Sequence, residues 1–190
     1  MSVALITGSG LGAVRGERIL FSDLNIEVAG GEAVFLRGKN GTGKTTLLRQ
    51  LAGLSEPQAG QVTREGTHHW IGHTNGLKPH ETPRSHLKHW ARVWGSHVDI
   101  ASVLDRMAMT RPADVPARML SAGQKRRTAL GRLLLVERPL WLLDEPFNAL
   151  DTDGQSMLSD MVTAHRESGG AVIAALHGSA PIAASREVML

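Results

Sequence analysis

The sequence contains no cysteine and no tyrosine, and only 4% of its 190 residues are aromatic. The absence of cysteine excludes disulfides, thiolate metal sites and thiol catalysis, so any redox chemistry would belong to other chains. No apolar run reaches the roughly 18 residues that a membrane-spanning helix needs. The first residues also lack the charged and long apolar segments of a signal peptide. We therefore expect a cytosolic protein without a membrane span of its own.

Charge gives little support for nucleic-acid binding. The formal net charge is only +3, and basic residues are dispersed except at Lys125, Arg126 and Arg127. A nucleic-acid surface would gather many such residues on one face. We therefore predict no nucleic-acid partner and interpret the basic triplet as a solvated helix face.

One stretch, GKNGTGKTT, fits the G-x-x-x-x-G-K-[ST] loop that binds nucleoside triphosphates. Its glycines allow backbone N–H groups to turn onto the phosphates, and the helix that begins here adds its positive end. Lys44 is expected to reach the β- and γ-phosphate oxygens, and the Thr45 hydroxyl to bind Mg²⁺. The predicted nucleotide-binding residues are Gly38, Lys39, Asn40, Gly41, Thr42, Gly43, Lys44, Thr45 and Thr46.

Strand and helix patterns alternate around this loop. Glu32–Arg37 (EAVFLR) predicts a buried strand, and Lys44–Leu54 predicts a helix that closes at Gly53. Further strands are expected at Val3–Thr7, Leu20–Val28, Gln61–Glu65, Trp70–Gly72, Leu140–Asp144, Ala171–Leu176 and near the C-terminus, and further helices at Leu87–Trp94, Ile100–Met107, Ser121–Leu134 and Gly154–Arg166. This order predicts an α/β fold with a mainly parallel sheet, as one domain over 1–190 with a helical insertion at about 74–135.

Three more stretches carry candidate chemistry. Leu140–Glu145 (LWLLDE) is an apolar strand that ends in adjacent acids, a pattern in which the first carboxylate binds Mg²⁺ and the second lies near the attacking water. Leu120–Gln124 reads LSAGQ. His177 follows a predicted strand at its C-terminal end, where ligands of open parallel sheets gather.

With Ala149–Asp151 (ALD), these stretches resemble in their order the motifs of the ATP-binding cassette (ABC) ATPases. The resemblance covers essentially the whole chain. It implies a P-loop NTPase cassette with a mainly parallel core, an N-terminal antiparallel β segment and a small helical subdomain. It also implies ATP and Mg²⁺ as ligands and a second copy of the chain, arranged head to tail, that encloses the nucleotide.

The resemblance assigns a role to each motif residue. Mg²⁺ would lie on Thr45 and Asp144, Glu145 would polarise the attacking water, and His177 would contact the γ-phosphate. The signature would serve the nucleotide of the partner copy. The nucleotide-site residues outside the phosphate loop are then Ser121, Gly123, Gln124, Asp151 and His73.

A narrower resemblance rests on WIGHTNGLKPHETPRSHL, on the signature with Ala122 at its second glycine, and on RPLWLLDEPFNALD. These stretches look like the ATP-binding subunits of the haem exporters of cytochrome c maturation. That likeness implies integral-membrane partners of the Ccm type, a peripheral place on the cytoplasmic face of the inner membrane, and no direct haem binding. The alternatives are the ATPase subunit of another ABC transporter and a soluble ABC ATPase, which usually carries two cassettes or a long coiled-coil insertion.

Two positions depart from the general ABC pattern. His73 aligns with the glutamine that joins the catalytic site to the membrane partner. The aromatic residue that usually stacks on adenine aligns near Arg15, whose guanidinium can also stack on a base.

The signature has a second interpretation from helix capping alone. Ser121 followed by Gln124 forms a capping box for the next helix. Both interpretations can hold, because a capped helix N-terminus is also an anion site.

Histidines and tryptophans gather in the middle of the chain. Seven of the nine histidines lie between His68 and His97, which we interpret as a solvated helical subdomain rather than a metal or haem site. Trp70, Trp90 and Trp94 share this region. They either pack in a core or line a groove that receives a helix of the membrane partner.

Overall fold

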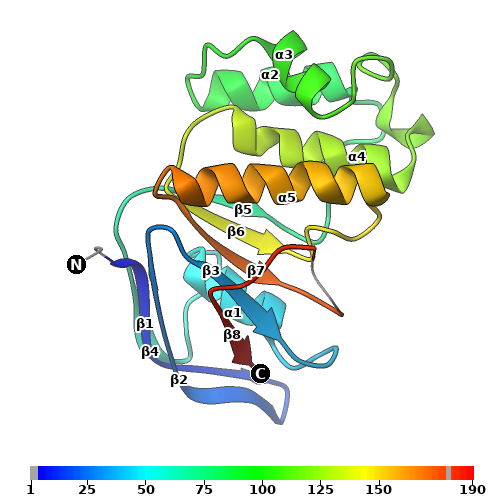
Figure 1. The fold of residues 1–190 in the computed structure, drawn as a ribbon. Coiled ribbons are helices and arrows are strands. Elements are labelled where there is room, and N and C mark those ends of the chain that lie inside the picture. The colour runs from blue at the N-terminus through cyan, green and yellow to red at the C-terminus, as the bar shows by residue number, and fades with distance from the viewer. Residues whose placement is uncertain (1–3, 179–180) are drawn as a thin grey trace. The chain divides into compact units, whose positions relative to one another are not determined.

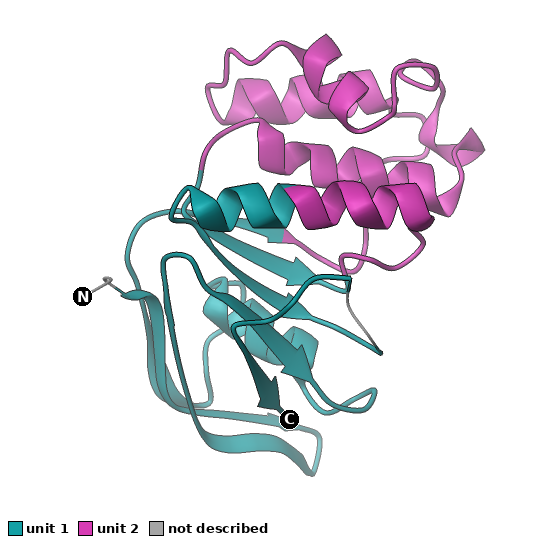
Figure 2. Ribbon diagram, viewed as in Figure 1, with its two compact units in different colours: residues 1–70, 138–145, 161–190 teal, residues 71–137, 146–160 magenta. Residues whose placement is uncertain are grey.

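A computed structural model describes residues 4–178 and 181–190 of the protein. The chain divides into two compact units (Figure 2). Of the described residues, unit 1 comprises those within Met1–Trp70, Arg138–Glu145 and Met161–Leu190, and unit 2 comprises Ile71–Glu137 and Pro146–Asp160. That these units make one ATPase domain with an insertion at about 74–135 stays a prediction.

A five-stranded sheet runs through unit 1 in the order β5-β6-β7-β3-β8 (Figure 1). The strands are β3 (Ala33–Arg37), β5 (His68–Ile71), β6 (Leu140–Asp144), β7 (Ala171–Ala175) and β8 (Arg186–Met189). β6 pairs with β7, and β3 with β7 and β8, all in parallel. Every residue of β6 and β7 is buried, as continuous apolar runs predict for parallel strands covered on both faces. The predicted mainly parallel sheet is confirmed.

A second sheet of unit 1 is antiparallel, in the order β2-β1-β4. β1 (Ala4–Arg15) is longer than the predicted Val3–Thr7, whose first residue lies outside the described part, whereas β2 (Arg18–Ala29) and β4 (Ala59–Arg64) lie close to their predictions. Side chains from Leu24 to Val28 alternate between inward and outward positions, but the alternation does not extend back to Leu20. Asp23 has a φ of 50°, and the ladder shifts register there, so Phe21 is buried and Ser22 is exposed.

The core of unit 1 joins both sheets to α1 (Lys44–Leu51). Three leucines of α1, Leu47, Leu48 and Leu51, have no exposed surface and belong to one cluster with buried side chains of β1, β2, β3, β6 and β7. The helix ends three residues before the predicted Leu54. Gly53, with a φ of 68°, donates its N–H to the Gln50 carbonyl and turns the chain, as such a glycine does after a helix.

Unit 2 is built from short helices. They are α2 (Pro83–Val93), α3 (Ile100–Arg106), η1 (Ala117–Met119), α4 (Ala122–Leu130), η2 (Gly131–Leu134) and the first part of α5 (Thr152–Glu167). The helices predicted at Leu87–Trp94 and Ile100–Met107 are present as α2 and α3, and each has a buried apolar face, formed by Leu87 and Ala91 and by Val103 and Leu104. Thr82 and Ser85 cap α2 in a reciprocal box, with Pro83 at the first helical position.

The helix predicted from Ser121 to Leu134 is not α-helical throughout. From Gly131 the chain tightens into the 3₁₀ turn η2. A β-carbon on Gly131 would lie 3.1 Å from Leu87 Cδ2 and 3.4 Å from Met107 Cγ, so α4 approaches the apolar core closely at this point. Within residues 4–178 and 181–190, no helix is long and apolar enough to span a bilayer.

Candidate nucleotide site

The loop between β3 and α1 takes a conformation that requires its glycines. Gly38, Gly41 and Gly43 have φ values of 142°, 79° and 111°, a region that other residues rarely adopt. A β-carbon on Gly38 would lie 2.5 Å from the Leu190 carbonyl oxygen, and one on Gly43 would lie 3.0 Å from the Phe21 ring. The loop is suited to bind a phosphate, because a loop of this kind presents successive backbone N–H groups at a helix N-terminus.

Lys44 lies along this loop and is almost fully buried. Its Nζ donates to the carbonyl oxygens of Gly38, at 2.7 Å, and Lys39, at 3.1 Å. Burial lowers the pKa of Lys44, while the nearby carboxylates of Glu145 and Asp144 oppose that shift. A desolvated ammonium held by carbonyls is suited to bind an anionic phosphate oxygen in their place.

Thr45 and Asp144 meet at the carboxyl end of β6. The Thr45 hydroxyl lies 3.1 Å from Oδ1 and 3.0 Å from Oδ2 of Asp144, whose side chain is buried. A hydroxyl and a carboxylate are hard oxygen ligands of the kind that Mg²⁺ prefers. These two residues fit the ion predicted for them.

Glu145 and His177 also meet in unit 1. Oε1 of Glu145 lies 2.9 Å from Nε2 of His177. The Glu145 N–H donates to the Ala175 carbonyl at 3.0 Å, and its φ of 50° is uncommon for a residue other than glycine. Such backbone strain gathers at functional sites. The carboxylate and the imidazole, predicted from separate motifs, form one pair.

The signature and the ALD segment lie in unit 2. Ser121 and Gln124 form the predicted capping box, with hydrogen bonds of 3.1 and 3.0 Å. A β-carbon on Gly123 would lie 2.8 Å from the Ala149 carbonyl oxygen, so only glycine allows this approach. Ala149 has a φ of 66°. The two motifs are therefore packed directly on each other.

Asp151 has two partners within unit 2 that sequence reasoning missed. Its Oδ1 lies 2.5 Å from Nη2 of Arg127 and accepts a 3.0 Å hydrogen bond from the Gly154 N–H. The ion pair with Arg127 and the hydrogen bond from Gly154 lower the pKa of Asp151. The carboxylate thus joins the signature helix α4 to the start of α5.

The two units divide the predicted site residues. Unit 1 brings together the phosphate loop, Asp144, Glu145 and His177, whereas unit 2 holds Ser121, Gly123, Gln124, Asp151 and His73. His73 is exposed in the segment after β5, and Arg15 is exposed at the end of β1.

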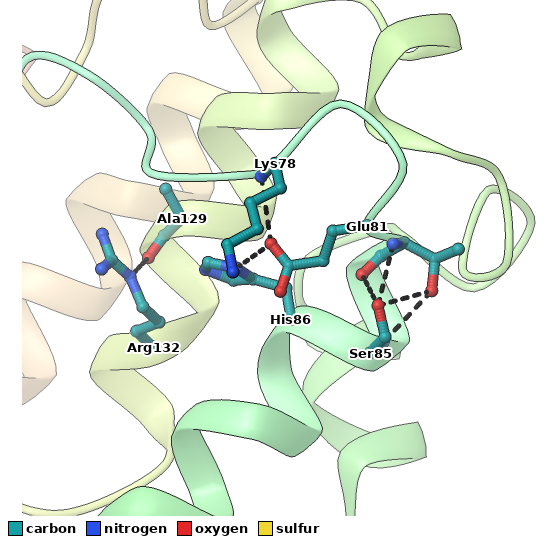
Figure 3. Close-up of polar contacts among 7 residues, drawn as sticks. Lys78, Glu81, Ser85, His86, Ala129 and Arg132 are labelled. Carbon is teal, nitrogen blue, oxygen red and sulfur yellow. Dashed lines mark hydrogen bonds and ion pairs between the residues drawn. The ribbon is translucent and has the colours of Figure 1, made fainter.

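The interpretation of the histidine segment as solvated is wrong for two of its members. His69 and His86 are each only 1% exposed. Figure 3 shows His86, whose Nδ1 lies 3.0 Å from a carboxylate oxygen of Glu81. Burial lowers the pKa of His86, although Glu81 opposes the shift. Among the described residues, no group of three His, Cys, Asp or Glu side chains is placed to hold a metal ion.

The interpretation of the basic triplet as a solvated face is wrong at Arg126, which is 3% exposed. The reason is its place on α4. Arg126 shares one helical face with the buried Ala129, Leu130 and Leu133, at spacings of three, four and seven residues. This spacing is the signal from which its burial could have been predicted.

Contacts of the three tryptophans favour packing over an open groove. Trp70 packs against the core cluster of unit 1. The rings of Trp90 and Trp94 have centroids 4.9 Å apart, and the Arg132 guanidinium lies 5.5 Å from the Trp90 centroid.

Comparison with known proteins extends these findings. The family model described as ABC transporter matches residues 21–148. The cytochrome c biogenesis ATP-binding export protein CcmA of Hyphomonas neptunium is 56% identical over 98% of this chain and 96% of its own length. The protein of the same name from Maricaulis maris is 46% identical over 90% of this chain and 85% of its own.

A solved structure has the same fold. The ATP binding subunit of an ABC transporter covers 91% of this chain and 79% of its own with a TM-score of 0.80, at 24% identity. The motifs, the sheet topology and these relatives agree. The chain therefore belongs to the ABC transporter ATP-binding family, and within it to the group of the cytochrome c biogenesis ATP-binding export proteins CcmA.

Proposed function

We propose that this chain is the ATP-hydrolysing subunit of a membrane ABC complex that serves cytochrome c biogenesis, through haem export or release of a haem-loaded chaperone. The observation that carries the proposal is the 56% identity, over 98% of the chain, to a protein named as an ATP-binding export protein of cytochrome c biogenesis. The pairs Thr45–Asp144 and Glu145–His177 support it, because Thr45 belongs to the phosphate loop and the carboxylates of Asp144 and Glu145 lie near Lys44 of the same loop.

Nucleotide binding would use the loop from Gly38 to Thr46. Backbone N–H groups and the Lys44 ammonium would bind the β- and γ-phosphates. Thr45 and Asp144 would hold Mg²⁺, which neutralises negative charge on the phosphate oxygens when it is bound. Catalysis in such a site comes mainly from positioning and electrostatic stabilisation.

Hydrolysis would use the pair of Glu145 and His177. The Glu145 carboxylate is the general base that orients the attacking water. His177 Nε2 lies within hydrogen-bond distance of that carboxylate. The imidazole can therefore hold the carboxylate in one orientation. It would also contact the γ-phosphate, as the resemblance to ABC ATPases implies.

The complete site would need a second copy of the chain. Ser121, Gly123, Gln124 and Asp151 of one copy would face the nucleotide on the phosphate loop of the other. Integral-membrane subunits of the Ccm type would bind the dimer at the cytoplasmic face of the inner membrane. His73 would stand in the path that couples them to the site, and neither nucleic acid nor haem is expected to bind this chain.

Co-purification from detergent-solubilised membranes tests the proposal. We expect an affinity-tagged chain to retain an integral-membrane subunit, which should raise its ATP turnover. The tagged Glu145→Gln variant is the control, and it should retain the same subunit without turnover. Purification of the chain alone from a membrane extract, with native ATPase activity, would contradict the transporter assignment.

A further inference from the structure

Arg126 is a buried cation that lies among oxygen acceptors from two other segments of unit 2. Its Nη1 donates to the Gly72 carbonyl at 2.8 Å and to Asn75 Oδ1 at 3.3 Å, and its Nε donates to the Pro146 carbonyl at 3.2 Å. Only 3% of the residue is exposed. One side chain of α4 thus binds both the segment after β5 and the chain after β6.

The segments that Arg126 joins each carry a candidate site residue. Gly72 and Asn75 lie on either side of His73, and Pro146 follows Glu145 directly. α4 itself begins at the signature, where Ser121 is its N-cap. The three elements are distant in the sequence, and the guanidinium is their shared partner.

The guanidinium suits this task for a chemical reason. It is planar and presents five N–H donors in a fixed fork, so one group can donate in several directions at once. A lysine ammonium in the same place is a compact charge that cannot span the same acceptors. A buried cation is also costly unless its donors are satisfied, so displacement of any one segment from Arg126 is opposed.

We infer that Arg126 is a positioning residue, which holds the His73 segment and the turn after Glu145 in register with the signature helix. The inference rests on the proposed function, because it assigns the three segments to one ATPase cycle. A displacement of α4 is then transmitted to the residue beside His73 and to the residue beside Glu145. Arg127, the residue after Arg126, forms an ion pair with Asp151 and so also ties the ALD segment to α4.

Arg126→Lys tests this role, with Arg132→Lys as its matched control. Arg132 is also a buried arginine of unit 2, 9% exposed. Figure 3 shows its bond to the Ala129 carbonyl, 3.0 Å from Nε, which stays between α4 and η2 and holds neither the His73 segment nor the turn after Glu145. Both variants keep the positive charge and lose the guanidinium fork. They therefore differ only in which segments lose their hydrogen-bond donor. Arg126→Gln is a second variant that avoids a buried charge if the lysine variant folds poorly.

The first measurement is amide hydrogen exchange over residues 72–76 in the native chain and the variants. Arg126→Lys should speed exchange there, whereas Arg132→Lys should not.

The second measurement is steady-state ATP hydrolysis by the complex with its membrane subunit. Arg126→Lys should lower kcat by about 10- to 100-fold at an unchanged KM, since a small displacement of a catalytic group costs that much.

Native exchange and native kcat in Arg126→Lys, or equal changes in Arg132→Lys, would overturn the inference. An unchanged kcat with faster exchange would also overturn it, because Arg126 would then be only structural. Failure of the proposed function would give a different result, because the native complex would then hydrolyse no ATP. In that case the inference fails as well, whatever the exchange shows.

Discussion

The imidazole Nε2 of His177 lies 2.9 Å from the carboxylate Oε1 of Glu145. Strand pairing explains this distance. β6 and β7 are parallel neighbours, and Asp144 at the end of β6 is in register with Ala175 at the end of β7. The residues that follow these two positions therefore emerge at the same edge of the sheet, where ligands of parallel sheets bind.

The first prediction concerns the general base. Glu145→Gln removes the proton acceptor but keeps the shape of the side chain, so ATP turnover should fall by about 10²- to 10⁴-fold. Equilibrium binding of ATP should remain, because the phosphate loop is unchanged. Glu167→Gln, at the exposed end of α5, is the control for loss of a carboxylate. Steady-state hydrolysis at the native rate in Glu145→Gln would remove this residue from the role of base.

The second prediction separates the phosphate loop from the signature. Lys44→Ala should weaken ATP binding by the isolated chain by about 10- to 100-fold, since a charged hydrogen-bond donor is lost. Ser121→Arg should leave that affinity unchanged and block the ATP-dependent dimer, measured by size-exclusion chromatography with light scattering. Ser102→Arg, which adds the same charge at an exposed position of α3, should still dimerise. Equal loss of ATP affinity in Lys44→Ala and Ser121→Arg would contradict the division of roles.

Sequence patterns predict the parallel strands well, because β6 and β7 are short apolar runs that only a doubly covered sheet can bury. The phosphate loop is also predictable, since its glycines are required by their positive φ values. Arg126 could be located on the buried face of α4 by its spacing, but its partners could not be predicted. The Gly72 and Pro146 acceptors are backbone carbonyls, which every residue has and no residue type marks.

Tertiary contacts also decide where local patterns stop. The alternation predicted for Leu20–Val28 runs through Asp23 without interruption. The bulge at Asp23, however, exchanges the inward and outward faces of β2 on its two sides. At Gly131, where α4 gives way to η2, the chain lies close to Leu87 and Met107, which belong to other segments. Neither the bulge in β2 nor the change from α4 to η2 can be predicted from local propensity.

The third prediction concerns stability in acid. The His165 ring is stacked on Trp141, with centroids 4.0 Å apart and planes 6° from parallel. Burial lowers its pKa, so the folded state binds a proton less readily than the unfolded state. The stability from neutral His165 is fully present above about pH 6.5, the pKa of an unfolded histidine, and is lost as pH falls toward the lower pKa of the folded state.

His165→Phe should keep the stacked ring and remove the titrating group. Its melting temperature should therefore fall less than that of the native chain between about pH 7.5 and pH 5.5. Part of the acid effect should remain, because burial also lowers the pKa values of His68 and His86. His97→Asn, at an exposed position, is the control. An equally steep loss in His165→Phe and the native chain would exclude His165 as a source of acid sensitivity.

The last prediction concerns His73, which stands where ABC ATPases usually have glutamine. A neutral imidazole and a glutamine amide can each donate and accept a hydrogen bond, so His73→Gln should keep most of the stimulation of ATP turnover by the membrane subunit. His73→Ala should keep ATP affinity and reduce stimulation to about a tenth or less, because the coupling group is gone while the phosphate loop is unchanged. The measurement is ATP turnover of the chain with and without its membrane subunit in detergent. Thr74→Ala, at an exposed neighbouring position, is the control and should be stimulated normally. If His73→Ala is stimulated as strongly as the native chain, coupling passes through other residues, and the alignment of His73 with the glutamine is wrong.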